Sequence, residues 1–508
     1  MSLNILILGT SNSLIKGGWV DGFRSSTPGC TITNLSVGAS PGIQFAALLH
    51  TDFSQYDYVF FDSVPNDEVY QYTTQGYSEV EFSTGILYEL FSTISAESRL
   101  VILGVCNKKY FKQESRIYSL RRSLAASCGA EFIDVRQLML AYSVFFVRRS
   151  GVVDLYDTHP SHPLPQHMFF IGGLIGRCLL QLPVVGELSG KCYRDGYSVW
   201  RASSMIGAGL NVVERSNSLL KESFALLVNG ESLDFNEPGM CVGFYLNFRG
   251  TNAVASLLDA DLKEVFHINL FGGVDDRIMK VFVPVPNGRV ISKILVREHF
   301  AGECYTPVMF KKKRDGQPAT ELQISHAVFL RPNQDKKFDM SSIESSASAC
   351  SNRLMNMVSS MIDSAIKVEQ EKTKKPGVFD YYGRYIYFDS RSNKCVSLGS
   401  ERKLEPADEL WPVIMKNEDG KVALYAEVGK DLFLLSAYSS RISISNSEVL
   451  PVGGGQEDIV GDSFIVGRKK SNRFALRCGE SFLSSRPNGA VVCNRIEAKN
   501  WELFSFIP

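Results

Sequence analysis

The sequence lacks a net charge, closely paired cysteines and long apolar runs. Its 54 Lys and Arg residues balance 54 Asp and Glu residues, so the formal net charge at pH 7 is zero. Proteins that bind nucleic acids or anionic membranes generally present a basic surface, so this balance argues against both classes. The 11 cysteines are odd in number and include no CxxC pair. We therefore expect mostly buried free thiols in a reducing compartment.

No apolar run reaches the length of about 20 residues that a membrane-spanning helix needs. The opening stretch MSLNILILGT has no basic start, no long apolar core and no cleavage site, so it indicates a first β-strand and not a signal peptide. We expect a cytoplasmic protein without a membrane span. The 508 residues, of which 44% are hydrophobic and 21% charged, are enough for about three globular domains.

Residues 1–185 alternate short apolar runs with helical patterns, which predicts a parallel sheet covered by helices on both faces. The expected strands are Asn4–Leu8, Thr31–Val37, Tyr58–Asp62, Leu100–Val105 and Glu131–Asp134. Helical patterns fall between them, for example at Phe82–Ala96 and Glu114–Cys128.

Residues 190–335 contain short β-type runs such as VGFYLNF, MKVFVPV and RVISKILV, separated by Gly, Asn, Asp and Pro. This pattern predicts an antiparallel β-sandwich of the jelly-roll-like kind, for which carbohydrate binding is one expected role. Residues 341–378 are rich in Ser and then in charged side chains, which predicts a linker with one helix at 351–369. The apolar side of that helix consists of Leu354, Met357, Val358, Met361 and Ile362.

Residues 379–508 are rich in β-type sequence and repeat three times. The units open on YIYFDSRSNKCVSLG, VALYAEVGKDLFLLS and FALRCGESFLSSRPNG, and they close on the aromatic residues Trp411, Phe464 and Trp501. Three four-stranded units that are each too small to bury their own apolar face must share one core. The pattern resembles a β-trefoil of the fascin-like, actin-crosslinking type. That resemblance implies carbohydrate or protein binding, with a purely structural appendage as the alternative.

Polar residues with catalytic chemistry follow the ends of several expected strands in the first zone. In open parallel sheets, binding and catalytic sites form outside the carboxyl ends of the strands. In chain order the candidates are Ser11, Gly38, Asn66, Asp154, Asp157, His159 and His162.

This order resembles the motif blocks of the SGNH (GDSL-type) hydrolase superfamily over residues 3–183. The resemblance implies a flavodoxin-like α/β domain in which Ser11 is the nucleophile. It also implies an oxyanion site formed by the backbone N–H groups of Ser11 and Gly38 and the side-chain N–H of Asn66. A late histidine is the general base, and an aspartate orients it. A hydrolase of this family needs no cofactor, whereas a transferase would use acetyl-CoA or another acyl donor.

The sequence departs from the family pattern at three places. Thr10 stands where the family usually has Asp, and Pro65 occupies a usually unconstrained position in the third block, SVPND. In the last block, neither His159 nor His162 has an Asp three residues before it. We favour His159 as the base with Asp157 as the acid, because YDTHPSH fits the last block with one residue missing. His162 is the alternative base, since its spacing to the final helix is the usual one, and Asp154 is the alternative acid.

The same residues also have structural interpretations. Ser11 can cap the following helix, and Asn66 with Asp67 can form an ordinary turn. The spacing of His159 and His162 is compatible with a pair of metal ligands. The prolines around them, however, would break the helix that usually presents such a pair, so we expect no metal.

The expected function is serine-dependent acyl-ester chemistry through acyl-Ser11, by an esterase or deacetylase or by an O-acetyltransferase. The two appended β-rich zones favour a carbohydrate or polysaccharide substrate, and a cytoplasmic enzyme would fit polysaccharide biosynthesis. The alternative is a non-catalytic glycan- or protein-binding protein with a relic SGNH domain. The sequence predicts no particular oligomeric state.

Overall fold

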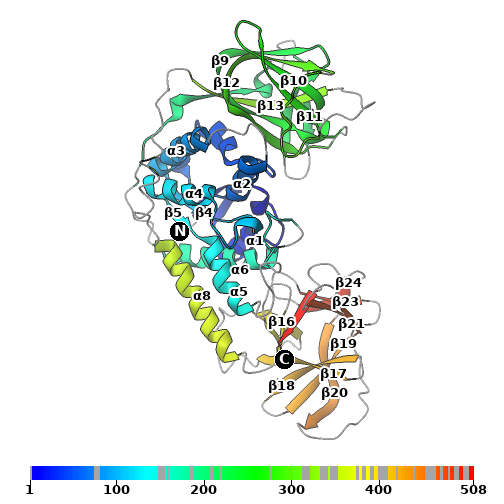
Figure 1. Ribbon diagram of the computed structural model, residues 1–508. Coiled ribbons are helices and arrows are strands. Elements are labelled where there is room, and N and C mark those ends of the chain that lie inside the picture. Colours follow the sequence, from blue (N-terminus) through cyan, green and yellow to red (C-terminus); the bar gives the residue numbers. More distant parts are fainter. Residues whose placement is uncertain are drawn as a thin grey trace.

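The computed structural model shows an α/β domain between two β-rich regions (Figure 1). The structure describes residues 3–73, 80–146, 155–156, 159–182, 188, 190–205, 210–216, 220–273, 277–298, 300–311, 321–331, 341, 343, 353–372, 377–379, 385–389, 394–398, 410–418, 421–428, 431–438, 441–451, 465–468, 473–478, 481–485, 491–495 and 503–507.

Within these residues, the N-terminal domain contains a five-stranded parallel sheet in the order β2-β1-β3-β4-β5. Its strands are β1 (Asn4–Leu8), β2 (Thr31–Asn34), β3 (Tyr58–Phe61), β4 (Arg99–Leu103) and β5 (Glu131–Ile133). This is the strand order of flavodoxin-like sheets. All five expected strands are therefore confirmed, although four of them end one to three residues earlier than the sequence predicts.

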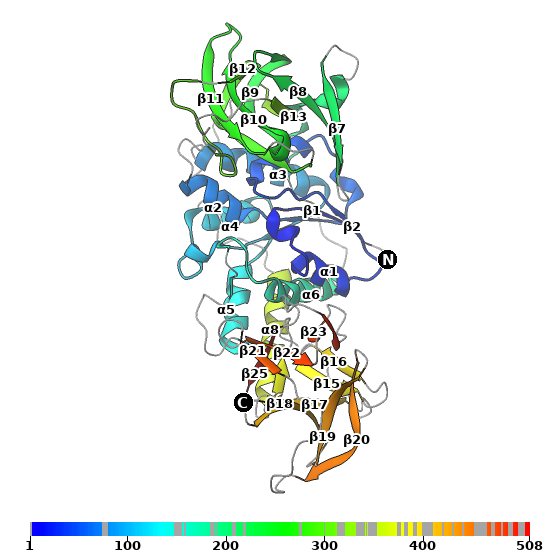
Figure 2. The same ribbon diagram turned by 90° about the vertical axis from the view of Figure 1, so that its right-hand side faces the viewer.

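Helices surround this sheet, as expected from the alternating pattern (Figure 2). They are α1 (Trp19–Ser26), α2 (Val64–Thr73), α3 (Val80–Glu97), α4 (Arg116–Ser127), α5 (Val135–Phe146) and α6 (Pro165–Gln181). Short 3-10 turns are η1 (Ser11–Ser13), η2 (Gly42–Leu48), η3 (Phe53–Gln55) and η4 (Lys108–Tyr110). Nothing in the described part of the chain combines the helix length and apolar content needed to cross a membrane.

Helices α1 and α6 approach each other closely because glycine lines their contact. A Cβ atom on Gly22 would lie 1.9 Å from the carbonyl oxygen of Phe169, and one on Gly172 would lie 2.0 Å from that of Trp19. Only glycine allows two helix backbones to come this near. The close contact fixes α1, which follows the loop of Ser11, against α6, which follows the loop of the histidines.

The middle domain, residues 190–335, is a curled antiparallel sheet around its own apolar core. Its strands are β6 (Tyr197–Arg201), β7 (Val212–Ser216), β8 (Lys221–Val228), β9 (Ser232–Asn247), β10 (Asn252–Leu258), β11 (Glu264–Phe271), β12 (Lys280–Arg297) and β13 (Glu321–Leu330). Its short turns are η6 (Arg194–Gly196), η7 (Ala202–Met205) and η8 (Phe248–Gly250). Two runs that the sequence suggests as separate strands, MKVFVPV and RVISKILV, lie mostly within the single long strand β12. Its pairing with β9 shifts register between Pro284 and Arg289.

The middle domain packs directly on the α/β domain. Val242, Tyr245, Phe282 and Val328 belong to the same apolar cluster as the parallel sheet and its helices, not to the core inside the curled sheet. The hydroxyl of Tyr245 also donates a hydrogen bond to the carbonyl oxygen of Gln44 in η2, at 2.8 Å. The two domains therefore share buried surface.

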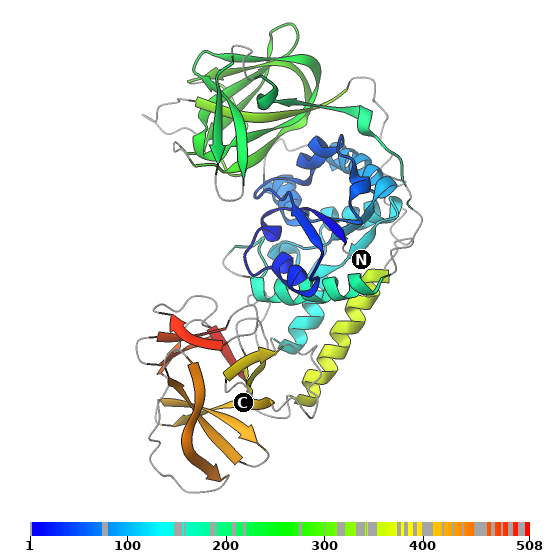
Figure 3. The ribbon, with the colours of Figure 1, turned by 180° about the vertical axis from the view of Figure 1, so that it is seen from behind.

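The helix expected near residues 351–369 is present as α8 (Arg353–Lys372). It contacts β5, α5 and α6, and Figure 3 shows it lying beside α5 and α6. The apolar side that the sequence identifies is the side in contact, because Leu354, Val358 and Ile362 are all buried in the α/β core. The segment that the sequence suggests as a linker thus contributes to the packing of the first domain.

The C-terminal region is rich in β-strands. They are β14 (Gly377–Phe379), β15 (Tyr385–Asp389), β16 (Lys394–Leu398), β17 (Leu410–Glu418), β18 (Lys421–Val428), β19 (Asp431–Tyr438), β20 (Arg441–Pro451), β21 (Ile465–Arg468), β22 (Arg473–Cys478), β23 (Ser481–Ser485), β24 (Val491–Arg495) and β25 (Leu503–Ile507). All described pairings are antiparallel. Of the three aromatic residues that close the sequence units, Trp411 lies in β17, whereas Phe464 and Trp501 lie outside the described residues.

Three kinds of strand pairing recur along this region. The first and second strands of each unit pair as β14–β15, β18–β19 and β22–β23. The second and third strands pair as β15–β16, β19–β20 and β23–β24. The fourth strand of each unit pairs with the first strand of another, as β17–β18, β21–β22 and β25–β14. The last of these pairs joins the beginning of the region to its end.

Candidate functional site

Ser11 lies at the carboxyl edge of the parallel sheet. Strand β1 ends at Leu8, and Ser11 begins the short turn η1 that leads toward α1. A hydrogen bond from the backbone N–H of Ser13 to the carbonyl oxygen of Thr10, at 3.1 Å, helps to close this turn. The side chain of Ser11 is half-buried, and its Oγ lies 2.8 Å from Nε2 of His162.

His162, and not His159, takes the place beside Ser11. The two imidazole rings are stacked, with centroids 4.0 Å apart and an angle of 22° between their planes. His159 is exposed, and its Nδ1 accepts a hydrogen bond from the backbone N–H of Ser161 at 3.2 Å. The expectation that His159 would lie against Ser11 is wrong. His162, the alternative base, is the histidine that lies beside Ser11.

The loop of residues 159–164, here called the His162 loop, is held by neighbouring loops. The side-chain amide of Asn12 donates to the carbonyl oxygen of Ser161 at 3.1 Å, and that of Asn107 donates to Ser161 Oγ at 2.9 Å. The backbone N–H of Lys108 donates to the carbonyl oxygen of Pro160 at 2.7 Å. These bonds fix Pro160 and Ser161. The next residue, His162, is thereby directed at Ser11, which explains the choice between the two histidines.

A buried carboxyl group supports Asn107 from behind. Oε2 of Glu68 accepts a hydrogen bond from the backbone N–H of Asn107 at 2.8 Å, and Oε1 accepts one from the hydroxyl of Ser115. Burial raises the pKa of Glu68 to about 7, although both hydrogen bonds act in the opposite direction. Glu68 is therefore partly protonated near neutral pH while it remains bonded to the loop that holds Ser161.

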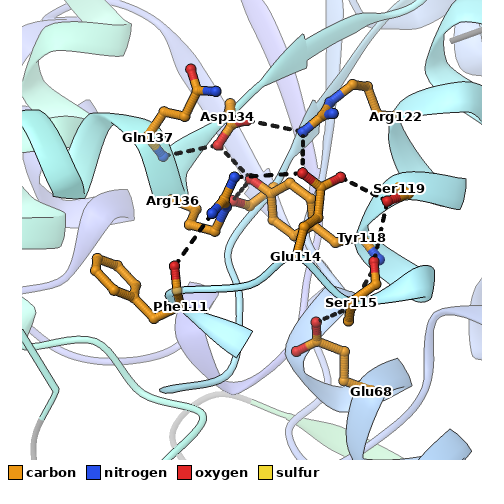
Figure 4. A network of polar contacts seen from close by, with 11 residues as sticks. Glu68, Phe111, Glu114, Ser115, Tyr118, Ser119, Arg122, Asp134, Arg136 and Gln137 are labelled. Carbon is orange, nitrogen blue, oxygen red and sulfur yellow. Dashed lines mark hydrogen bonds and ion pairs between the residues drawn. The ribbon is translucent and has the colours of Figure 1, made fainter. Parts of the chain in front are cut away.

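Ser115 in turn belongs to a network of polar side chains around the start of α4 (Figure 4). Its Oγ accepts the backbone N–H of Tyr118 and so caps the helix. The guanidinium of Arg122 contacts Glu114 at 2.9 Å and Asp134 at 3.1 Å, and the hydroxyl of Tyr118 lies 2.7 Å from Asp134. The network joins α4 to the end of β5 and keeps Ser115 in place under Glu68.

The loop of residues 35–41 between β2 and η2, here called the Gly38 loop, passes beside Ser11. A Cβ atom on Gly38 would lie 3.9 Å from the Cβ of Ser11. Asn66, in the first turn of α2, donates one side-chain N–H to the carbonyl oxygen of Ser40 at 3.0 Å and is thereby tied to this loop. Among the described residues, the backbone N–H groups of Ser11 and Gly38 meet no hydrogen-bond acceptor. These two donors can thus receive an anionic oxygen.

The first turn of α2 is anchored by Asp67. Its carboxylate accepts hydrogen bonds from the backbone N–H of Gly42 at 2.7 Å and from the hydroxyl of Ser63 at 2.6 Å. It also forms an ion pair with Arg121 at 2.7 Å, in which both side chains are buried. Asn66 and Asp67 are consequently parts of an ordered helix start and not of a free turn.

Ser13, the other serine of the first block, has a structural role. It is buried, donates to Oδ2 of Asp62 at 2.9 Å and accepts a hydrogen bond from Nε1 of Trp19 at 3.1 Å. Burial raises the pKa of Asp62 to about 7. The hydrogen bonds among Ser13, Asp62 and Trp19 thus hold the turn that contains Ser11. Because Ser13 is buried, Ser11 has the more accessible hydroxyl of the two serines.

The sequence does not predict several residues of this site. Two residues that it does predict lie outside the part of the chain that the structure describes. Asp154 and Asp157, the predicted acids, lie outside the described residues. Asn12, Asn107 and Ser161 were not expected in the site. One signal was available for Asn107, since it follows the end of β4 as the other candidates follow β1, β2 and β3.

No family model matches the chain, and no curated protein matches it. Among solved structures, SeviL bound to asialo-GM1 saccharide is 9% identical with a TM-score of 0.19 and covers 26% of this chain and 94% of its own. A GlcNAcα1-4Gal releasing endo-β-galactosidase from Clostridium perfringens is 8% identical with a TM-score of 0.20 and covers 63% and 93%. The capsular polysaccharide assembling protein CapF from Staphylococcus aureus is 11% identical with a TM-score of 0.17 and covers 65% and 98%. Scores this low carry no argument about this chain.

Proposed function

We propose that the protein catalyses acyl transfer from an ester through an acyl-Ser11 intermediate, and that its N-terminal domain is of the SGNH hydrolase type. The distance of 2.8 Å between Ser11 Oγ and His162 Nε2, at the carboxyl edge of a parallel sheet, carries the proposal. A serine hydroxyl is a weak nucleophile until a base removes its proton, and this distance is within the reach of such a base.

In the proposed reaction, Nε2 of His162 takes the proton of Ser11 while Oγ attacks the ester carbonyl carbon. The negative charge that forms on the carbonyl oxygen is stabilised by the backbone N–H groups of Ser11 and Gly38, with the second side-chain N–H of Asn66 as a third donor. Collapse of the tetrahedral intermediate releases the alcohol, which receives the proton from His162. Water or a sugar hydroxyl then gives its proton to His162 and attacks the acyl carbon. As the bond from this carbon to Ser11 Oγ breaks, His162 returns the proton to Oγ, which restores both residues.

For Nε2 to accept a proton, the neutral His162 ring must carry its hydrogen on Nδ1. A carboxylate next to Nδ1 would hold this tautomer and stabilise the imidazolium, and Asp157 and Asp154 are the proposed groups. His159 covers one face of the same ring.

The proposed substrate is an ester of a carbohydrate or polysaccharide, and the proposed enzyme is an esterase or deacetylase or an O-acetyltransferase. Two appended β-rich regions are the feature that supports an extended substrate, and the middle domain packs on the α/β domain next to the Gly38 loop. For a transferase, acetyl-CoA or another acyl donor would supply the group.

We further propose that the C-terminal region is a β-trefoil. The threefold recurrence of strand pairing supports this fold, because a trefoil consists of three four-stranded units of one kind. The pairing of β14 with β25 supports it as well, since it joins the first and last strands. In this proposal the trefoil binds glycan or protein.

The test uses the purified full chain with p-nitrophenyl acetate and a fluorophosphonate probe. Ser11→Ala should abolish both turnover and labelling, whereas Ser25→Ala, an exposed serine on α1, should leave both intact. Release into water indicates an esterase, and release that a sugar acceptor stimulates indicates a transferase. Absence of Ser11-dependent labelling and turnover from about pH 6 to 9 would refute the proposal and favour a non-catalytic binding protein.

A further inference from the structure

We infer that Ser40 is a positioning residue through which the middle domain fixes the Gly38 loop for acyl transfer, an inference that rests on the proposed function. In this inference the middle domain contributes to the geometry of the acyl-transfer site, in addition to packing against the α/β domain.

Ser40 is fully buried and joins three parts of the molecule. Its hydroxyl donates to the carbonyl oxygen of Gly38 at 3.0 Å and accepts a hydrogen bond from the backbone N–H of Phe282 in β12 at 2.8 Å. Its carbonyl oxygen accepts the side-chain N–H of Asn66 at 3.0 Å. Ser40 therefore contacts Gly38 and Asn66, the candidate oxyanion donors that follow β2 and β3. It also contacts strand β12 of the middle domain.

The Gly38 loop needs such support because its backbone is strained. Ala39 has a φ of 53°, in the left-handed region that residues with a Cβ atom avoid. Strained backbone of this kind persists only where the surrounding structure enforces it. The hydroxyl of Tyr70, which donates to the carbonyl oxygen of Ala39 at 3.1 Å and lies 3.5 Å from that of Phe282, adds a second link between the loop and β12.

The donor that β12 offers to Ser40 is itself rigidly placed. From Lys280 to Pro284, β12 pairs with β9, whereas its pairing with β10 is limited to Lys293–Arg297. The N–H of Phe282 is thus free to point at Ser40. The Phe282 ring is fully buried, packs on Tyr245 with centroids 4.9 Å apart, and belongs to the core of the α/β domain. A shift of the middle domain would consequently move the hydrogen bond to Ser40.

This arrangement matters for chemistry because oxyanion donors act only when they are aimed in advance at the developing charge. Loosening the Gly38 loop misplaces the N–H of Gly38 in the transition state, whereas binding of the neutral ester depends on it much less. Loss of the Ser40 hydroxyl should therefore lower kcat and leave KM nearly unchanged.

The experiment compares Ser40→Ala with Tyr245→Phe in the full chain. Both changes remove one hydroxyl from the contact between the domains, but the Tyr245 hydroxyl bonds to Gln44 and not to the Gly38 loop. For Ser40→Ala we expect kcat for p-nitrophenyl acetate and the rate of fluorophosphonate labelling to fall about 10- to 100-fold, with KM changed less than about threefold. Tyr245→Phe should retain kcat, and Ser40→Thr, which keeps a hydroxyl, should recover most of the turnover.

The outcomes separate this inference from the proposed function. Suppose that the wild-type chain is labelled at Ser11. If Ser40→Ala then keeps the wild-type kcat, or if Tyr245→Phe lowers kcat as much as Ser40→Ala does, the inference is overturned and the proposed function stands. If the wild-type chain shows no Ser11-dependent turnover, both are overturned. If Ser40→Ala does not fold, as judged by circular dichroism, Tyr70→Phe is the deciding variant. The inference requires that Tyr70→Phe lower kcat while KM stays constant.

Discussion

Ser11 and His162 lie 151 positions apart in the chain, yet their Oγ and Nε2 atoms are 2.8 Å apart in the fold. Each residue lies in a loop that adjoins a helix, and those helices, α1 and α6, are pressed together at Gly22 and Gly172. The distance between the two side chains is thus a product of helix packing as well as of the sheet. This relationship leads to the first prediction.

His162→Ala should lower kcat for ester hydrolysis by about a thousandfold or more, because Ser11 loses the group that accepts its proton. His159→Ala serves as the matched control and should cost less than about tenfold, since the exposed His159 ring stacks on the His162 ring and accepts a hydrogen bond from the backbone N–H of Ser161. Steady-state kinetics and the rate of fluorophosphonate labelling measure both. The reverse ranking would assign the base to His159 and reject the geometry described here.

Asn107→Ala and Ser161→Ala should each lower kcat about tenfold, because both remove the 2.9 Å hydrogen bond between these side chains, one of those that hold the His162 loop. Their effects should not add in the double variant, since the two changes break the same bond. Lys109→Ala, at an exposed position two residues from Asn107, is the control and should behave as wild type. Fully additive losses would mean that the two residues act independently.

Glu68 should contribute stability that is lost as the pH rises through about 7. The folded state raises the pKa of Glu68 from its ordinary 4.5 to about 7, so between these values it binds more protons than the unfolded chain. The free energy of unfolding therefore decreases with pH in this window, by up to roughly 3 kcal/mol from this one group. Asp62, whose pKa is also raised to about 7, acts in the same direction.

Glu68→Gln should reduce this pH dependence without removing it, because Asp62 remains. Denaturant unfolding at about pH 5 and about pH 8 measures the difference for each variant. The exposed Glu81 provides the control, and Glu81→Gln should keep the wild-type dependence. An unchanged difference in Glu68→Gln would show that Glu68 does not titrate in this range.

Ile362→Ala should destabilise the α/β domain by about 2–5 kcal/mol, since the side chain is buried between α8 and the first domain. Asn356→Ala, at an exposed position of the same helix, should change the free energy of unfolding by less than about 0.5 kcal/mol. Denaturant unfolding of the full chain makes the comparison. Equal stability of the two variants would indicate that α8 does not pack on this domain in solution.

The sequence predicts the parallel sheet well because buried strands and amphipathic helices alternate with clear periods. The predicted and observed bounds of the first strand are the same, Asn4–Leu8, and Gly38 lies beside Ser11. The choice between the two histidines is not predictable in this way. Which imidazole enters the site depends on hydrogen bonds from Asn12 and Asn107, residues that are distant in the chain and have no pattern that identifies such a role.

Contacts between distant segments account for the other differences. The apolar side of α8 is evident from its spacing, but an amphipathic helix does not reveal which surface covers it. The bond between Ser40 and Phe282 joins residues 242 positions apart through a hydroxyl and a backbone N–H, and neither residue type signals it. Such contacts follow from how the domains pack, which local patterns do not encode.

The return of α8 to the first domain has a consequence for synthesis on the ribosome. A nascent chain that has completed α6 must add the whole middle domain before Arg353 begins the helix that covers β5, α5 and α6. At 5–20 residues per second this interval is roughly 9–34 s. Until then the part of these elements that α8 covers is open to water, so a translational pause before α8 would prolong the exposure of apolar surface.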